Sequence, residues 1–461
     1  MHLVCVGGSD AGISAALRAR EVDAGVEVTA VLTDAYPNFS ICGIPYYLSG
    51  EVGEWRDLAH RSSAELEKAG VKLVTDTTAT AIDVAERRLH VRASDGREDS
   101  IGYDALVIGT GAVPVRPPLP GLDALGPDDG VHVLHTIGDS RVLADHLARR
   151  QPGSALIVGG GYIGLEMAEA LTTRGIAVTQ AEMRSQVLPT VDPALAALIA
   201  DELVSHDVDV RTSVTITGID RAPYEAAGRL RVTGTDGFTL DVDLVLVVVG
   251  VRPDTALAGS AGATLAANGA IAVDRRMATN LPHVWAAGDC VQTHHQLLDT
   301  PTYLPLGTTA HKQGRIAGEN ALGGDAYFHG SLGTQVVKVF DLVAARTGLR
   351  QEEAAEAGFK PATVAVTADD HKAYYPGATP ITIHLTGDTT SGRLLGAQLI
   401  GRLGAEIAKR VDVYATAIHA GLGVAQFADL DLSYAPPLGS PWDAVQVAAQ
   451  AWVRAHRERS A

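Results

Sequence analysis

Two stretches of the chain repeat the same order of apolar strand, glycine-rich turn and helix. The first runs over Leu3–Arg20 and the second over Ala155–Arg174. In each, a short continuous apolar run gives way to glycines and then to apolar residues at helical spacing, which is the pattern of a buried strand followed by a helix. A repeat of this kind predicts two copies of a nucleotide-binding fold in one chain.

Between and after these two units, the apolar pattern marks crossings from one domain to the next. Tyr103–Gly111 has the pattern of a buried strand that stops at a Gly-Thr-Gly turn, and the proline-rich stretch Val113–Pro120 follows it. A second apolar strand over Val245–Pro253 stops at Gly250. Glycine and proline end regular structure, so both places are predicted to connect domains.

The last part of the chain has a different pattern. After Gly323, alternating strands such as Gln335–Phe340 and Thr379–Leu385 come before a helix predicted over Gly404–His419. Neighbouring strands followed by helices are typical of an α+β arrangement. We therefore predict an α/β protein with two Rossmann-like dinucleotide-binding domains and a third, α+β domain at the C-terminus.

The second glycine turn carries the clearest phosphate-binding motif. Gly159, Gly161 and Gly164 match G-x-G-x-x-G between a strand and a helix. The first glycine permits a tight turn, the second lets the backbone approach a pyrophosphate, and the third allows the helix to pack closely. Ile163 lies inside this motif and is predicted to contact the cofactor with the three glycines.

An acidic residue ends the strand that follows this turn. Glu182 lies 18 residues beyond Gly164, at a distance where a carboxylate can bind the two hydroxyl groups of an NADH ribose. Arg184 is close enough in sequence to accept the 2′-phosphate of NADPH instead. The sequence therefore favours NADH and leaves NADPH open.

The first glycine turn keeps Gly7 and Gly12 but has Ser9 in the middle position. Serine is small, so a phosphate can still approach the backbone. Asp34 stands 22 residues after Gly12, at about the right distance for a ribose partner. Asp34 is either that partner or a solvated loop residue, and both interpretations stay open.

A third nucleotide feature is the apolar strand within Val284–Cys290, which ends in Gly288 and Asp289. The Asp289 carboxylate can accept hydrogen bonds from a flavin ribityl chain, and a helix starting near Thr308 would direct its N-terminus toward the flavin. The alternative is an ordinary turn at the end of a strand.

The chain has only three cysteines, Cys5, Cys42 and Cys290, which are too few and too scattered for a disulfide framework or a zinc site. Cys5 lies in an apolar strand and is predicted to be core. Cys42 lies at a predicted helix start, where the helix dipole and the N–H groups lower the pKa of a thiol. Cys42 is therefore the candidate redox-active thiol, and we predict no metal.

Composition narrows the class of protein. The chain has 461 residues, of which 46% are hydrophobic and 20% charged, as in soluble proteins of several domains. Its net charge of −17 opposes binding to nucleic acid. No apolar run has the length of a membrane helix, and an apolar strand follows Met1 too closely for a signal peptide. We predict a cytoplasmic enzyme without a membrane or nucleic-acid partner.

Together these motifs resemble the pyridine nucleotide-disulfide oxidoreductase superfamily, and within it the coenzyme A-disulfide reductase, NADH oxidase and NADH peroxidase branch. The resemblance covers essentially the whole chain. The stretches that carry it are Gly7–Gly12, Phe39–Tyr47, Asp104–Gly111, Gly159–Glu166, Gly250–Asp254, Trp285–Asp289 and Tyr434–Pro437.

The resemblance implies a division of the chain and a set of cofactors. It implies an FAD-binding domain at 1–118 and 252–325, an NAD(P)H-binding domain at 119–251, and a C-terminal dimerisation domain at 326–461. FAD and NADH, with NADPH possible, are the implied cofactors, and the implied assembly is a homodimer in which each C-terminal domain completes the partner's active site. The cofactor-binding residues then include Thr110, Gly111, Gly250 and Glu166, the last near the nicotinamide.

The resemblance also implies the chemistry. Hydride passes from the nicotinamide to the flavin, and Cys42 exchanges electrons with the flavin on its other face. No second cysteine lies five residues from Cys42, so the thiol must cycle with a small partner or as a sulfenic acid. Tyr434, with Tyr374 or Tyr375 as companion, resembles the tyrosines that approach the reactive sulfur, where a phenol can protonate a departing thiolate. Packing at an interface is the alternative for each tyrosine.

Two positions depart from the family pattern. Asp10 stands where NADH oxidases and peroxidases have a histidine beside their cysteine, and Leu32 stands where an acid for the flavin ribose is expected. We therefore favour an FAD-dependent NAD(P)H oxidoreductase that reduces a low-molecular-weight disulfide, persulfide or related sulfur species through Cys42. One alternative is a flavin oxidase or dehydrogenase that acts on an organic substrate, with the cysteine incidental. The other is an electron-transfer or redox-sensing flavoprotein with a protein partner.

Overall fold

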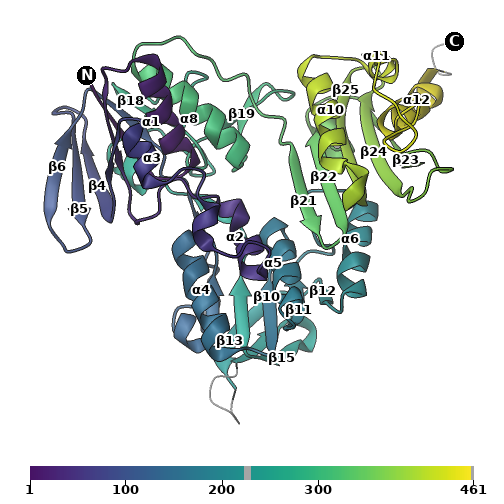
Figure 1. The fold of residues 1–461 in the computed structure, drawn as a ribbon, viewed down its shortest axis with the longest axis horizontal. Helices are drawn as coiled ribbons and strands as arrows, with labels where there is room; N and C mark the ends of the chain where they lie inside the picture. The colour runs from purple at the N-terminus through teal and green to yellow at the C-terminus, as the bar shows by residue number, and fades with distance from the viewer. Residues whose placement is uncertain (223–229, 458–461) are drawn as a thin grey trace. The chain divides into compact units, whose positions relative to one another are not determined.

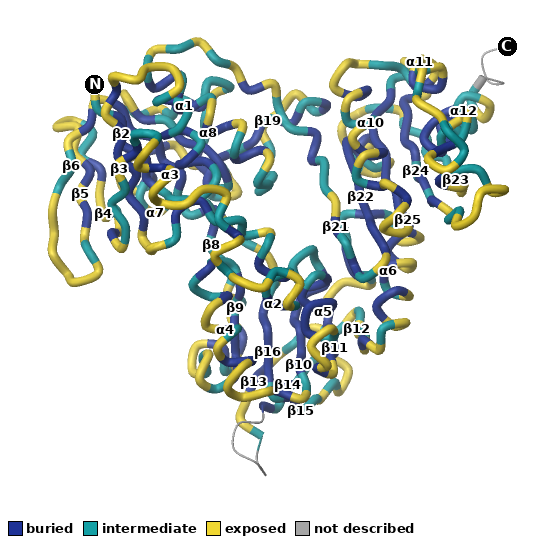
Figure 2. The backbone as a smooth tube through the Cα atoms, in the orientation of Figure 1, coloured by how far each residue is buried: buried dark blue, intermediate teal, exposed yellow. Residues whose placement is uncertain are grey.

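The structure, a computed structural model, describes residues 1–222 and 230–457, and its chain forms two compact units. The first unit comprises Met1–Pro152, Leu244–His294 and Thr300–Ser331, and the second comprises Gly153–Asp243, His295–Asp299 and Leu332–Ala461. Each unit is therefore assembled from segments that are distant in sequence (Figure 1). Buried residues are concentrated on the strands of each unit (Figure 2).

The centre of the first unit is a five-stranded parallel sheet in the order β18-β7-β1-β2-β3. Its strands are β1 (His2–Val6), β2 (Glu27–Val31), β3 (Val71–Val74), β7 (Ala105–Ile108) and β18 (Val284–Ala286). Every residue of β7 is buried, as expected for a central parallel strand that is covered on both faces. The carboxyl ends of parallel strands share one edge, which is where open α/β sheets bind their ligands.

Two helices of this unit, α1 (Asp10–Val22) and α8 (Gly307–Ala321), pack closely against each other. A Cβ atom added to Gly314 would lie 2.3 Å from the carbonyl oxygen of Ala11. One turn further along, a Cβ atom on Gly318 would lie 2.2 Å from the carbonyl oxygen of Ala15. Glycine lets the two backbones approach because it has no side chain to separate them. The first two turns of α1 are thereby held against the second half of α8, although their residues are far apart in sequence.

The other elements of the first unit surround this core. Its remaining helices are α2 (Ile44–Ser49), α3 (Ser63–Lys68), α4 (Ile137–Arg150) and α7 (Ala256–Ser260). An antiparallel sheet contains β4 (Thr77–Asp83), β5 (Arg88–Ala93) and β6 (Glu98–Gly102). Two pairs are β8 (Ala112–Pro114) with β17 (Val251–Pro253), and β9 (Val131–Val133) with β16 (Leu244–Val247). The short strands β19 (Thr293–His295) and β20 (Thr300–Thr302) follow Asp289 in the chain.

The second unit begins with another parallel arrangement, which repeats the strand, turn and helix of β1 and α1. Its parallel strands are β10 (Ser154–Val158), β11 (Ala177–Glu182) and β12 (Asp209–Thr212). The accompanying helices are α5 (Tyr162–Thr173) and α6 (Pro193–Ser205), and an antiparallel sheet follows with β13 (Ile216–Arg221), β14 (Leu230–Gly234) and β15 (Thr239–Val242). The predicted repeat of a nucleotide-binding unit is therefore present in the fold.

The C-terminal part of the second unit is an antiparallel sheet with helices. The sheet has the order β21-β22-β25-β24-β23 and contains β21 (Gln335–Val339), β22 (Leu342–Gly348), β23 (Pro361–Asp369), β24 (Pro380–Asp388) and β25 (Leu394–Arg402). The helices are α9 (Gln351–Glu356), α10 (Ile407–His419), α11 (Val424–Ala428) and α12 (Ala444–Arg457). Helix α10 begins at Ile407 rather than at Gly404, because Glu406 has a left-handed backbone with φ of 53°, a conformation that interrupts a right-handed helix.

The helices of the described chain are short. The longest of those in residues 1–222 and 230–457, α8, has 15 residues, and none there has the length and apolar character needed to cross a membrane, which takes about 20 residues. The architecture is mixed α/β with an α+β C-terminal part, as the apolar pattern predicts.

Candidate functional site

The first glycine turn is shaped by contacts that exclude any larger residue. Gly7 has φ of +114°, and a Cβ atom there would lie 2.0 Å from the carbonyl oxygen of Gly109. A Cβ atom on Gly12 would lie 2.1 Å from the carbonyl oxygen of Gly7. Ser9 is the N-cap residue of α1 and is partly buried. The turn therefore brings the N-terminus of α1, with its unsatisfied N–H groups, to the edge of the parallel sheet, where an anion can bind.

The strand end beside this turn is apolar. The side chain of Leu32 is buried and occupies the space next to Gly8, where an added Cβ atom would lie 2.1 Å from Leu32 Cδ2. Asp34 lies two residues further on and is exposed, and its Oδ1 accepts a hydrogen bond of 2.9 Å from the backbone N–H of Tyr36. This local turn is what a solvated aspartate forms. The geometry favours the loop interpretation of Asp34, and ribose binding by its carboxylate stays a prediction.

The second glycine turn has the same construction. Gly159 has φ of +120°, and a Cβ atom on Gly164 would lie 2.2 Å from the carbonyl oxygen of Gly159. Around Gly161, the N-cap residue of α5, a Cβ atom would meet no other atom within 4 Å. Ile163 and Glu166 follow in the first turns of α5 and are partly buried. The two outer glycines serve packing, whereas Gly161 leaves room for a ligand to approach the backbone.

Glu182 stands at the position in this unit that Leu32 has in the first. It is buried at the end of β11, and its Oε2 accepts a hydrogen bond of 2.7 Å from the N–H of Gly160. Its Oε1 accepts one of 2.8 Å from the N–H of Arg184. These two bonds fix the carboxylate beside the glycine turn, and each oxygen keeps a lone pair for a further donor.

The turn after β18 carries the predicted flavin residues Gly288 and Asp289. Gly288 has φ of +88°, and its N–H donates a hydrogen bond of 2.9 Å to Oε1 of the fully buried Gln313. Burial, assisted by the nearby Asp10 carboxylate, raises the pKa of Asp289 to about 6. Gln313 was not identified from the sequence, because no motif distinguishes it from other polar residues of an amphipathic helix.

The two segments predicted to connect domains lie side by side within the first unit. Thr110 Oγ1 donates a hydrogen bond of 2.5 Å to the carbonyl oxygen of Asp254, whose N–H donates one of 3.0 Å to the carbonyl oxygen of Gly111. The carbonyl oxygen of Gly250, a residue with φ of +108°, accepts a bond of 2.9 Å from the N–H of Val115. These bonds extend the β8–β17 pair, so Thr110, Gly111 and Gly250 belong to one two-stranded connection.

The three cysteines differ in exposure. Cys5 and Cys290 are fully buried, and burial raises the pKa of Cys5 to about 12 and that of Cys290 to about 11. Cys42 is exposed and lies in a 3₁₀ turn, Ile41–Gly43, directly before α2. Two buried thiols of raised pKa are poor nucleophiles, which leaves Cys42 as the accessible thiol.

The loop that carries Cys42 is fixed by aromatic contacts. The rings of Phe39 and Trp55 stack with centroids 5.4 Å apart, and the guanidinium of Arg141 lies 4.9 Å from the Trp55 ring centroid. The backbone N–H of Ser40 donates a hydrogen bond of 2.8 Å to the carbonyl oxygen of Leu58. Stacking and cation–π contacts of this kind restrict the segment directly before Cys42.

The structure distinguishes between the two tyrosines proposed as companions of Tyr434. Tyr374 and Tyr434 are both exposed, and the hydrogen bond between their hydroxyl groups raises the pKa of Tyr434. Tyr375 instead places its ring 5.7 Å from the ring of His371. Tyr374 is therefore the residue that the fold brings to Tyr434.

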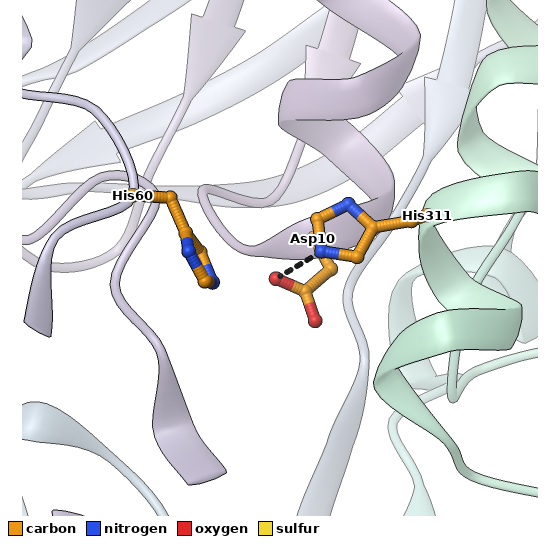
Figure 3. Close-up of side chains that lie close together, drawn as sticks. All are labelled: Asp10, His60 and His311. Atoms are coloured by element: carbon orange, nitrogen blue, oxygen red, sulfur yellow. Dashed lines mark ion pairs between the residues drawn. The ribbon is translucent and has the colours of Figure 1, made fainter. Parts of the chain in front are cut away.

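One group of chemically active side chains was not identified from the sequence. Asp10, His60 and His311 come from three distant segments, and one ligand atom of each lies within 4.8 Å of those of the others. The rings of His60 and His311 stand on either side of the Asp10 carboxylate (Figure 3). Burial raises the pKa of Asp10, while the two histidines oppose this effect. Only the folded chain brings these residues together, so no sequence spacing reveals them.

Comparison with known proteins places the chain in a family. Residues 1–314 match the family described as pyridine nucleotide-disulphide oxidoreductase, and residues 334–444 match its dimerisation domain. These two ranges include both glycine turns, Cys42 and the Tyr374 region.

Three relatives illustrate the similarity. An NADH oxidase of Methanocaldococcus jannaschii is 31% identical over 98% of this chain and 98% of its own length. An NAD(P)H sulfur oxidoreductase (CoA-dependent) of Pyrococcus abyssi is 32% identical over 97% of both chains. The solved structure of an NAD-dependent persulfide reductase from A. fulgidus is 36% identical, with a TM-score of 0.93, and covers 99% of this chain and 84% of its own.

The resemblance seen in the sequence and the predicted fold class are confirmed by these matches, and so are FAD and NAD(P)H as the cofactors of the family. The dimerisation domain is consistent with a homodimer. The chain belongs to the pyridine nucleotide-disulphide oxidoreductase family, whose members are FAD-dependent oxidoreductases that use NAD(P)H.

Proposed function

We propose that this protein uses NAD(P)H to reduce a low-molecular-weight disulfide, persulfide or related sulfur species, with Cys42 as the attacking thiolate. The observation that carries the proposal is the exposure of Cys42, in contrast to the complete burial of Cys5 and Cys290. The similarity to a sulfur oxidoreductase and to a persulfide reductase over nearly the whole chain supports the same substrate class.

The residues of the first unit fit FAD. The turn at Gly7, Ser9 and Gly12 leaves the N–H groups of α1 available for a pyrophosphate, and Asp289 offers a carboxylate for a ribityl hydroxyl. When bound, FAD supplies a hydride acceptor that can relay two electrons to sulfur. We propose the domain limits implied by the resemblance: FAD at 1–118 and 252–325, NAD(P)H at 119–251, and dimerisation at 326–461.

The second unit fits NADH better than NADPH. The Glu182 carboxylate is buried and held by two backbone N–H groups, so it retains its place as an acceptor for a ribose diol. A 2′-phosphate would bring a second negative charge against this carboxylate. Arg184 is exposed, and we propose that it remains in solvent and that NADH is the preferred donor.

The proposed reduction has two stages, formation of a mixed disulfide at Cys42 and its reduction by two electrons. The Cys42 thiolate attacks one sulfur of R–S–S–R, forms the mixed disulfide Cys42–S–S–R and releases RS⁻. A persulfide R–S–S–H gives the same mixed disulfide and releases HS⁻. Two electrons from NAD(P)H then break the mixed disulfide and regenerate the Cys42 thiolate with release of RS⁻.

A proton donor is needed for each departing thiolate. We propose that Tyr434 of the partner subunit fills this role in a homodimer, because a phenol can donate to a departing sulfur. The hydrogen bond with Tyr374 orients the Tyr434 phenol and, because it raises the pKa of Tyr434, keeps that phenol protonated rather than making it more acidic. The small number of cysteines also suits a reducing compartment, and we infer a cytoplasmic location.

An anaerobic titration tests the role of Cys42. The enzyme, oxidised with its small disulfide substrate, is titrated with NADH while flavin absorbance and released thiol are recorded. We expect the wild-type protein to take up about two electrons more per FAD than Cys42→Ser does, with release of a small thiol that only the wild type shows. Ser40→Ala is the matched control, because it alters the same loop and keeps the thiol.

If wild type and Cys42→Ser take up the same number of electrons, Cys42 is not redox-active and the proposal is wrong. Oxygen is the second candidate acceptor, because the similarity to an NADH oxidase also extends over nearly the whole chain. In that case Cys42→Ser should still consume NADH in air, with peroxide or water as the product.

A further inference from the structure

We propose that Asp10, His60 and His311 form a binding site for a divalent transition-metal ion of the class of Zn²⁺. Asp10 is the first residue of α1, His311 lies in the second turn of α8, and His60 belongs to the loop before α3. Two imidazole nitrogens and one carboxylate oxygen converge here, with all three ligand atoms within 4.8 Å of one another (Figure 3). Imidazole and carboxylate together are ligands that Zn²⁺ and its neighbours in the first transition row accept.

The distance between two of the ligand atoms already suits a tetrahedral ion. His311 Nε2 lies 3.4 Å from Asp10 Oδ1. Bonds of about 2.0–2.1 Å to a tetrahedral Zn²⁺ place neighbouring ligand atoms about 3.4 Å apart. The same distance is too long for a good direct hydrogen bond, which has its donor and acceptor at about 2.7–3.2 Å. Asp10 and His311 form an ion pair when His311 is protonated, and a metal ion that takes the place of that proton fits the same spacing.

His60 is placed to become the third ligand after a small movement. Its ring centroid is 5.9 Å from that of His311, with an angle of 73° between the ring planes. Its ligand atom is within 4.8 Å of the other two, so a shift of no more than about 1.4 Å toward each brings it to tetrahedral spacing. His60 is exposed, and an exposed side chain can make that shift by changing its rotamer without disturbing the core.

The orientation of His311 is already fixed by a partner. Its Nδ1 lies 2.9 Å from the hydroxyl oxygen of Ser14, one turn further along α1. When Nδ1 carries the proton and donates to Ser14, the lone pair of Nε2 faces Asp10 and is available to a metal ion. Histidine ligands in metal sites characteristically donate their other ring N–H in this way. The close packing of α1 on α8 keeps Ser14 and His311 in register.

A second cluster in the described chain lacks these properties. Glu202, His206 and Asp341 also lie within 4.8 Å of one another. Both oxygens of the Glu202 carboxylate, however, accept hydrogen bonds from the Arg402 guanidinium, at 2.9 and 2.8 Å. The His206 ring stacks on Phe340 at 3.8 Å. A guanidinium already neutralises this carboxylate and would repel a metal ion, so this cluster provides a control.

The proposal is tested by Zn²⁺ binding to the FAD-containing enzyme. The protein is stripped of metal with a chelator and then titrated with Zn²⁺ in competition with a chromophoric chelator. We expect about one Zn²⁺ per chain, with affinity reduced at least about 10-fold in His311→Asn and in His60→Asn, and about 10-fold in Ser14→Ala. His206→Asn should bind Zn²⁺ as the wild type does.

Unchanged Zn²⁺ affinity in both His60→Asn and His311→Asn overturns the proposal, and a loss of affinity in Cys42→Ser would then identify the thiol as the ligand instead. His60 is exposed, so its substitution leaves the fold intact, and the FAD content of each variant checks this directly. Because binding is read without turnover, failure here is distinguishable from failure of the proposed sulfur chemistry.

Discussion

Substitution of Glu182 by Gln tests the nucleotide site most directly. The change keeps the size of the side chain and removes its charge, so the packing at the end of β11 is preserved. In the native protein both carboxylate oxygens accept backbone hydrogen bonds, of 2.7 Å from Gly160 and 2.8 Å from Arg184. A glutamine has one oxygen and one NH₂ group, so one of these two backbone N–H groups would then face a donor instead of an acceptor.

The magnitude follows from the hydrogen bonds that the carboxylate can make. Hydrogen bonds to a charged group contribute about 1.5–3 kcal/mol, and the substitution removes the charge from the bonds to the ribose diol. A loss of that size corresponds to a decrease of about 13- to 160-fold in kcat/KM for NADH. The effect should appear mainly in KM, because the ribose is bound equally in the ground state and the transition state.

Initial rates of turnover with NADH and with NADPH, at a saturating concentration of the small disulfide, measure this effect on kcat and KM. For NADPH the kcat/KM of the same variant should rise or stay unchanged, because the repulsion between the carboxylate and a 2′-phosphate has been removed. Arg184→Ala is the matched control and should leave NADH unaffected. An unchanged kcat/KM for NADH in Glu182→Gln, or a loss confined to kcat, would refute the assignment of Glu182 to the ribose.

Two further predictions concern the flavin turn and the tyrosine pair. The pKa of Asp289 is raised to about 6, so the folded protein holds this proton between about pH 4 and 6, where the unfolded chain releases it. Stability is therefore lost as the pH rises through that range. Asp289→Asn should raise the free energy of unfolding of the FAD-free protein by up to about 3 kcal/mol at pH 7.5 but not at pH 4. Equal effects of the substitution in urea unfolding at both pH values would contradict this. Tyr434→Phe should lower kcat for disulfide reduction about 100-fold, whereas Tyr375→Phe should change kcat little. Equal losses of kcat in steady-state assays of the two variants would show that Tyr434 is not the proton donor.

Local motifs were the part of the site that the sequence could predict. The contacts of Gly12 with Gly7 and of Gly164 with Gly159 arise within one turn, so their spacing is enough to identify them. Asp34 shows the limit of such counting. Its distance from Gly12 suits a ribose partner, but spacing does not show that Leu32 fills the strand end and that Asp34 lies beyond it in a solvated turn.

The rest of the site depends on tertiary structure. The choice between Tyr374 and Tyr375 is decided by which side chain the loop directs toward Tyr434, and adjacent residues in one sequence motif do not reveal this. Asp10, His60 and His311 are even more distant from one another in the sequence. Asp10 and His311 lie close together in space because of the glycine-mediated contact between α1 and α8. The sequence predicts no metal because metal motifs are recognised only when their ligands are close in the chain, and these three residues are not.

The contact between α1 and α8 also has a consequence for synthesis of the chain. The parallel sheet of the first unit needs β18, which ends at Ala286, and its covering helix pair needs Gly314 and Gly318. At a synthesis rate of about 5–20 residues per second, the ribosome takes roughly 16–64 s to reach Ala321, the last residue of α8. Between the synthesis of β7 and that of β18, one edge of β7 has no partner strand, and residues 153–243 of the other unit are made in this period. The first strand to be made thus belongs to one of the last sheets to close.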